Sequence, residues 1–156
     1  MKQGDRIQDL PGFNLSVKTA DGTATTLASY IGTKPCVVFF YPKAGTTVCT
    51  KEACKFRDEY SVFTSAGAEV VGISSDKPDA LAKFVKSQRL NFPLLSDEGS
   101  KLRKGLKVKG DLFGLMPGRV TYVFDKTGTC VLSFHSALNA QKHVNEAIAA
   151  IKALPA

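Results

Sequence analysis

The feature that most constrains the fold is a short, uninterrupted apolar run, Cys36 to Tyr41 (CVVFFY). A strand with one wet face alternates apolar and polar residues, whereas a run without alternation is typical of a strand that is covered on both faces. The run therefore predicts a strand at the centre of a sheet. The rest of the chain has to supply the cover for both of its faces.

Helical and extended patterns alternate after this strand. A helical pattern runs from about Cys49 to Ala66 and stops at Gly67. Residues 68–74 form a second buried apolar run, and residues 76–90 have helical periodicity with Pro78 in the first turn. The order strand, helix, strand, helix predicts parallel strands joined by right-handed connections.

The remaining patterns complete an α/β plan. We expect a strand at 13–18 that enters a hairpin turn at Asp21-Gly22, a short strand at 92–95, a helix at 96–106, a β-hairpin formed by 119–125 and 129–135, and a final helix at 140–153. A βαβ half followed by a hairpin and a closing helix predicts a thioredoxin-like fold, with a central mixed sheet flanked by helices and an N-terminal β-hairpin. No repeat or linker divides the chain, so residues 1–156 are expected to form a single domain.

The chain is basic, with 21 Lys and Arg against 14 Asp and Glu and a net charge of +7. The densest positive stretch is residues 101–109 (KLRKGLKVK), in which apolar residues recur as they do in an element packed on a core. We interpret it as a solvated face rather than a nucleic-acid site, because no interleaved aromatic residues accompany it. No apolar run approaches the ~18 residues that a membrane span needs. Neither nucleic acid nor a membrane is therefore an expected partner.

Cys49 occupies the position where ligand sites of open α/β sheets form, between the end of a strand and the start of the next helix. The backbone N–H groups of a first helical turn are unpaired, and the helix dipole favours an anion there, so the thiolate form of a cysteine is stabilised. The alternative is a small buried hydrophobe, which is the usual fate of a free cysteine. We interpret Cys36 and Cys130, which fall in predicted strands, in this second way.

The spacing of Cys49 and Cys54 sets a geometric condition. Across five helical residues the chain rises ~7.5 Å and turns ~140°, so the two side chains point to different faces and lie beyond disulfide reach. If Cys49 were oxidised to a sulfenic acid, condensation with Cys54 would require the first helical turns to unwind. The alternative for Cys54 is an incidental cysteine on the flank of the helix.

Residues 39–54 read FFYPKAGTTVCTKEAC. This string resembles the peroxiredoxins, whose signature is P-x-x-x-T-x-x-C, although the family commonly has Thr-Pro-Gly-Cys where this chain has Thr46-Thr47-Val48-Cys49. The second cysteine, followed by Phe56-Arg57-Asp58, resembles the Q or bacterioferritin-comigratory branch. The similarity extends through GAEVVGISSD at 67–76, FPLLSDEGSKLRK at 92–104 and GDLFGLMPGRVTYVFDKTG at 110–128, and so covers nearly the whole chain.

The resemblance implies an active site of Pro42, Thr46, Cys49 and Arg119, with Cys49 as the peroxidatic and Cys54 as the resolving cysteine. These residue types suit the chemistry. The Thr46 hydroxyl can hydrogen-bond a bound oxygen, and the Arg119 guanidinium supplies fixed donors that stabilise a thiolate and polarise the O–O bond. The rigid ring of Pro42 suits a wall that limits water.

The function predicted in this way is a thiol-dependent peroxidase that reduces hydrogen peroxide and organic hydroperoxides through a Cys49–Cys54 disulfide, in antioxidant defence. The resemblance implies thioredoxin as the reductant, with glutaredoxin as the alternative, and a monomeric enzyme. Sulfur cycles through its own oxidation states, so neither a cofactor nor a metal is expected. The two histidines and four cysteines do not show the clustered spacing of a zinc site.

Two rival functions belong to other classes. A thioredoxin-like disulfide exchanger would carry a C-x-x-C motif, which the sequence does not contain. A basic binding module could keep the fold without catalysis. The expected location is the cytoplasm if the chain is bacterial, or a chloroplast or other organelle interior after removal of a transit peptide.

Overall fold

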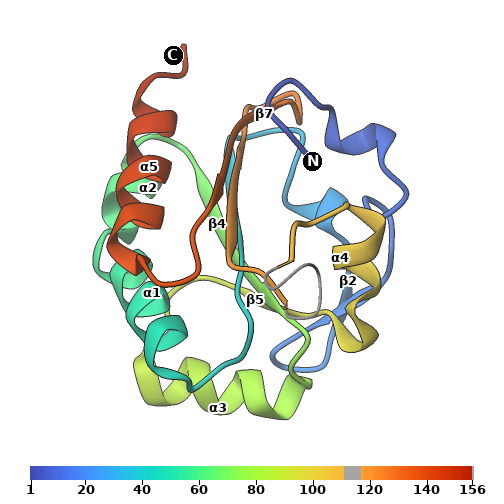
Figure 1. Cartoon of the computed structure of the whole chain (residues 1–156), viewed down its shortest axis with the longest axis vertical. Coiled ribbons are helices and arrows are strands. Elements are labelled where there is room, and N and C mark those ends of the chain that lie inside the picture. Colours follow the sequence, from blue (N-terminus) through green and yellow to red (C-terminus); the bar gives the residue numbers. More distant parts are fainter. Residues whose placement is uncertain (111–116, 156) are drawn as a thin grey trace.

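The computed structural model describes residues 1–110 and 117–155. Expectations that involve residues 111–116 and 156, which include part of the 110–128 stretch and of the 1–156 domain, lie outside the described residues. A seven-stranded mixed sheet runs through the molecule in the order β2-β1-β5-β4-β3-β6-β7. Figure 1 shows helices on both sides of this sheet, which confirms the predicted architecture.

The predicted central strand is β3 (Cys36–Phe40), in which every residue is buried. It pairs in parallel with β4 (Glu69–Ser74) and antiparallel with β6 (Val120–Phe124). β4 pairs in parallel with β5 (Leu94–Ser96), so the predicted parallel half of the sheet is confirmed. The helix that connects β4 to β5 is α3 (Pro78–Gln88), which has proline at the start of its first turn, as expected.

The sheet ends in two hairpins. β6 pairs antiparallel with β7 (Cys130–His135), and β1 (Val17–Thr19) pairs antiparallel with β2 (Ala24–Thr25), which confirms the N-terminal hairpin. The first strand is shorter than the expected 13–18. Residues before Val17 form turns instead, with the N–H of Leu15 donating to the carbonyl of Gly12 at 3.2 Å. Gly12 is held against Gly105 of α4, where a Cβ would collide with Leu106.

The two faces of the sheet are covered by different elements. One core cluster joins β3 and β6 to α1 (Thr47–Asp58), α2 (Tyr60–Ser65), α3 and α5 (Ala140–Lys152). The other joins the opposite face to α4 (Lys101–Gly105) and to the N-terminal segment with its 3₁₀ turns η1 (Ile7–Asp9) and η2 (Leu27–Ser29). The turn η3 (Glu98–Ser100) leads into α4. Within the described ranges, no helix is both long and apolar enough to span a bilayer.

The single helix expected from about Cys49 to Ala66 is two helices. α1 begins two residues early, at Thr47, and ends at Asp58, because Glu59 (φ −97°, ψ 7°) leaves the helical conformation. After the break, Phe63 of α2 packs against Phe56 of α1, with 5.8 Å between ring centroids. One side of this segment nevertheless forms a continuous apolar stripe, in which Cys49, Ala53, Phe56 and Phe63 are buried and Tyr60 is partly buried.

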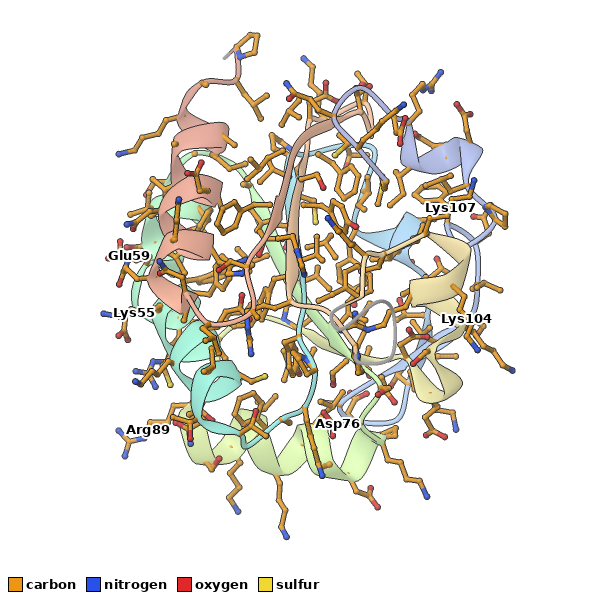
Figure 2. All side chains as sticks on the ribbon, viewed as in Figure 1. Lys55, Glu59, Asp76, Arg89, Lys104 and Lys107 are labelled. Carbon is orange, nitrogen blue, oxygen red and sulfur yellow. The ribbon has the colours of Figure 1, made fainter. Side chains whose placement is uncertain are left out.

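The basic stretch at 101–109 is only in part the solvated face that we expected. Its lysines are exposed, and Figure 2 shows Lys104 and Lys107 extending away from the α4 side of the molecule. Arg103 instead is 7% exposed and lies over the Phe40 ring. Its guanidinium donates to the carbonyls of Gly118 at 2.9 Å and Tyr41 at 3.0 Å. Arg103 thus joins the end of β3 to the residue before Arg119.

We predict that Arg103→Met lowers the free energy of unfolding by about 2–3 kcal/mol, because two buried carbonyls lose a charged donor. The neighbouring Lys104→Met is the matched control, since its side chain is exposed on the same helix, and we expect a change below ~0.5 kcal/mol. Urea denaturation of the reduced proteins measures both. Equal stability of the two variants would contradict a structural role for Arg103.

Candidate active site

Cys49 is the third residue of α1, the helix that follows the central strand β3 and a short loop. Its side chain is 1% exposed and faces the core between the sheet and the helices. The N–H groups of Thr47, Val48 and Cys49 belong to the first turn, where a helix has no internal acceptors for them. The sulfur is therefore attached to the electropositive end of α1.

Arg119 contacts the Cys49 sulfur directly. It immediately precedes β6, is 4% exposed, and points one guanidinium nitrogen, Nη2, at Cys49 Sγ over 3.2 Å. Its Nη1 donates to Glu52 Oε1 at 2.7 Å, and its Nε donates to the carbonyl of Ala137 at 2.9 Å. All three nitrogens are thus occupied, so the guanidinium is fixed in its plane and in its distance from the sulfur.

Burial and charge act on these groups in opposite directions. Burial raises the pKa of Glu52 to about 7, although the charge of Arg119 and its hydrogen bond oppose the rise. Burial alone would lower the pKa of Arg119, but the charges of Glu52 and Cys49 outweigh it and raise that pKa. Arg119 is therefore a permanent cation, whereas Glu52 changes its charge near neutral pH.

His143 of α5 lies on the other side of Glu52. It is fully buried, its Nδ1 is 2.8 Å from Thr121 Oγ1, and its Nε2 is 2.8 Å from the Ser136 carbonyl. Nδ1 also lies 3.6 Å from Glu52 Oε2, and the ring packs edge-on against Phe134. Burial lowers the pKa of His143 to about 4, so the imidazole is neutral at physiological pH.

The loop before α1 carries the other two predicted residues. Thr46 is exposed, and its hydroxyl donates to the Lys43 carbonyl at 2.7 Å, while Pro42 is half-buried next to β3. The carboxylate of Asp76, labelled in Figure 2 beyond the end of β4, accepts the N–H of Ala44 at 2.7 Å. Asp76 therefore anchors this loop to the carboxyl end of the sheet. The structure brings Cys49 and Arg119 into contact and places Pro42 and Thr46 in the preceding loop.

Cys54 lies on the same unbroken helix as Cys49, and both thiols are free. It is half-buried, and its Sγ donates to Gln88 Oε1 of α3 at 3.3 Å. Arg57 supports the contact by donating to the backbone carbonyl of Gln88 at 2.6 Å. A five-residue separation on an intact helix is a rise of ~7.5 Å, which exceeds the usual Cα–Cα distance of a disulfide. In this form of the protein the two sulfurs cannot bond.

The other two cysteines belong to the core, as predicted. Cys36 is fully buried and Cys130 is 1% exposed. Burial raises the pKa of both thiols, that of Cys130 to about 11. Both thiols therefore stay protonated and unreactive. Across residues 1–110 and 117–155, no three His, Cys, Asp or Glu side chains are grouped as a metal ion would require.

Sequence reasoning missed Glu52 and His143, and the same signal could have found both. Glu52 falls three residues after Cys49, inside the apolar stripe of α1, and it is completely buried. His143 falls among the apolar positions of α5, between Ala140 and Val144. A charged or polar residue in the buried stripe of a helix requires a buried partner, and each of these residues lies toward the other.

Comparisons with known proteins agree with this geometry. Residues 7–133 match the AhpC/TSA family. The chain is 49% identical to peroxiredoxin Q, chloroplastic, from Populus jackii over 92% of this chain and 66% of that protein. It is 49% identical to the protein of the same name from Gentiana triflora over 88% of this chain and 62% of the relative. The chain thus spans slightly less than two thirds of the length of these two relatives.

Solved structures match over the whole fold. Peroxidoxin BcpB from Mycobacterium tuberculosis superposes with a TM-score of 0.87 at 35% identity, over 100% of this chain and 99% of that chain. The bacterioferritin comigratory protein of Xanthomonas campestris, described with alkyl peroxide reduction activity, has a TM-score of 0.83 at 29% identity, over 96% and 98% of the two chains. The chain therefore belongs to the AhpC/TSA family and, within it, to the peroxiredoxins of the Q and bacterioferritin-comigratory branch.

Proposed function

We propose that this protein is a thiol-dependent peroxidase in which Cys49 attacks the peroxide and Cys54 resolves the oxidised sulfur. The contact between Arg119 and the Cys49 sulfur, 3.2 Å at the start of a helix, is the observation that carries the proposal. A fixed cation and a helix N-terminus both favour a thiolate over a thiol. Placed together in a buried site, they supply a nucleophile where no metal or organic cofactor is needed.

In the first step the Cys49 thiolate attacks the terminal oxygen of a hydroperoxide. An S–O bond forms as the O–O bond breaks, which leaves a sulfenic acid on Cys49 and an alkoxide or hydroxide that takes up a proton to leave as alcohol or water. Negative charge moves from sulfur to the leaving oxygen, and donors that are already in place stabilise it. Arg119 provides such donors, and we expect the Thr46 hydroxyl, which here donates to the Lys43 carbonyl, to turn toward the bound peroxide.

The surroundings of the loop support organic hydroperoxides as substrates beside hydrogen peroxide. A groove adjoins the loop on the side of α3, and it is lined by Ala44, Gly45, Ala80, Lys83, Phe84 and Ser87. Its largely apolar walls suit an alkyl substituent that would follow the peroxide group into the site. The alkyl peroxide reduction described for the Xanthomonas campestris relative is consistent with this substrate class.

In the second step the Cys54 thiol condenses with the sulfenic acid, which releases water and forms a disulfide. The helix that holds both residues must first unwind, since the intact α1 keeps them apart. Cys54 must also leave Gln88, and the Arg57 contact with the Gln88 carbonyl opposes that movement. Local unfolding of α1 is therefore part of each catalytic cycle.

In the third step an external dithiol reduces the disulfide by thiol–disulfide exchange. We infer that thioredoxin is this dithiol and that the enzyme acts as a monomeric single domain. The net charge of +7 favours docking of an acidic reductant. For location, the chloroplastic names of the plant relatives favour an organelle interior over a bacterial cytoplasm.

We expect Cys49→Ser to abolish peroxide consumption, because a serine hydroxyl at neutral pH is neither ionised nor easily oxidised. Cys36→Ser is the matched control, since that thiol is buried on the opposite face of the sheet, and its turnover should match that of the native enzyme at equal stability. A coupled assay with thioredoxin, thioredoxin reductase and NADPH measures both variants. Full turnover by Cys49→Ser would overturn the proposed function.

We expect Arg57→Ala to accelerate disulfide formation several-fold after a pulse of peroxide, because the end of α1 loses a charged hydrogen bond to α3. At high peroxide the variant should also accumulate less sulfinic acid, since resolution then outcompetes further oxidation. Lys55→Ala, an exposed change on the same helix, is the control. Stopped-flow fluorescence and intact-mass spectrometry measure rate and oxidation state. An unchanged rate of closure would show that the Arg57 contact does not restrain unwinding.

A further inference from the structure

The environment of His143 links it to the contacts that orient Arg119. His143 lies in α5, its two nearest polar partners are 2.8 Å away, and neither is a residue of the predicted active site. One partner, Thr121, is on β6 two residues after Arg119, and the other, the Ser136 carbonyl, directly precedes Ala137. Ala137 is the residue whose carbonyl accepts from Nε of Arg119.

The hydrogen bonds define the state of the imidazole. A backbone carbonyl can only accept, so Nε2 of His143 carries the proton that is donated to Ser136. In the neutral ring Nδ1 is then an acceptor, and the Thr121 hydroxyl donates to it. His143 therefore connects the strand that begins after Arg119 to the segment that ends the β6–β7 hairpin, through both ring nitrogens at once.

Neutrality of His143 matters for Glu52. Glu52 Oε2 is buried without a hydrogen-bond partner among the described residues, and it faces Nδ1 over 3.6 Å. A protonated imidazole at that place would compete with Arg119 for the carboxylate and draw it away. A neutral imidazole leaves the ion pair between Glu52 and Arg119 Nη1, at 2.7 Å, undisturbed.

We propose that His143 is a positioning residue of the active site: it fixes the Ser136–Ala137 segment and keeps a neutral nitrogen toward Glu52, and so holds Arg119 against the Cys49 sulfur. These two contacts hold two of the three guanidinium nitrogens of Arg119, because Nε donates to the Ala137 carbonyl and Nη1 donates to Glu52. The third, Nη2, then has a single orientation, toward Cys49. This inference rests on the proposed function of Cys49.

The other titratable groups near His143 and Glu52 are Tyr41 and His135, and neither changes the charge state that the proposed role requires. Tyr41, at the end of β3, stays uncharged because burial raises its pKa far above neutral, and its neighbours Cys49 and Glu52 act in the same direction. His135 of β7 acts on His143 by lowering its pKa further, in the same sense as burial and Arg119. Burial, Arg119 and His135 together outweigh the hydrogen bond to Ser136, which raises the pKa of His143, so the imidazole stays uncharged as the proposed role requires.

The test compares three single variants of the full chain. His143→Leu removes both hydrogen bonds, and His143→Gln offers an amide donor to the Ser136 carbonyl. Val144→Ala removes buried packing at the next position of α5 and leaves the His143 side chain and its polar partners in the protein. We expect His143→Leu to lower the second-order rate of peroxide reduction by about 10- to 100-fold, as expected for a displaced catalytic group. His143→Gln should recover most of this loss, and Val144→Ala should stay within about twofold of the native rate.

A second measurement separates positioning from general destabilisation. The measurement is the pH profile of the rate at which iodoacetamide alkylates Cys49. This profile should shift to higher pH in His143→Leu and should not shift in Val144→Ala, because only the first variant releases Arg119 from the sulfur. A native rate and an unmoved profile in His143→Leu would overturn the inference while Cys49 remained the nucleophile. If the proposed function itself were wrong, Cys49→Ser would keep its peroxidase turnover.

Discussion

The Arg119 guanidinium is shared between two acids, the Glu52 carboxyl and the Cys49 thiol, in a site that is almost closed to water. Burial raises the pKa of Glu52 to about 7, because the loss of water around the carboxylate outweighs the charge and the hydrogen bond of Arg119. When Glu52 is protonated, the charge of Arg119 is left to the thiolate. The sheet brings these groups together, because β3 leads into the helix that carries Cys49 and Glu52, and Arg119 directly precedes β6.

The helix α1 has to satisfy two opposing demands. In the proposed mechanism its first turn has to be ordered to present N–H groups and the Cys49 sulfur to the site, and the same helix has to unwind for a disulfide with Cys54. Its buried stripe, with Ala53 and Phe56, favours the folded form, and so do the contacts at Gln88. A segment with few such restraints opens easily, so the number of restraints on α1 determines how quickly the oxidised sulfur is resolved.

Periodicity was sufficient to predict most of the fold, because burial on both faces of β3 and β4 leaves a plain apolar signature. It fails at Glu59, where the helix is interrupted although neither glycine nor proline marks the position. Periodicity also fails to predict that Arg103 is buried, because the lysines around it in the sequence are exposed. Cys49 is predicted from its position between a strand and a helix as well as by resemblance, and Arg119 by resemblance alone. Glu52 and His143 stand out in the sequence only as polar residues at buried helical positions, and their partners are brought together only on folding.

The central claim is that Cys49 is the sulfur that meets peroxide and that Cys54 is the one that closes the bond. Peptide mapping by mass spectrometry, after one equivalent of hydrogen peroxide and blocking of the remaining thiols, tests it most directly. Trypsin cuts after Lys51, between the two cysteines, so the disulfide is detected as two linked peptides. The account predicts a link between Cys49 and Cys54, with Cys36 and Cys130 recovered as free thiols. A bond to Cys36 or Cys130, or a Cys49 that is still blocked as a free thiol, would contradict it.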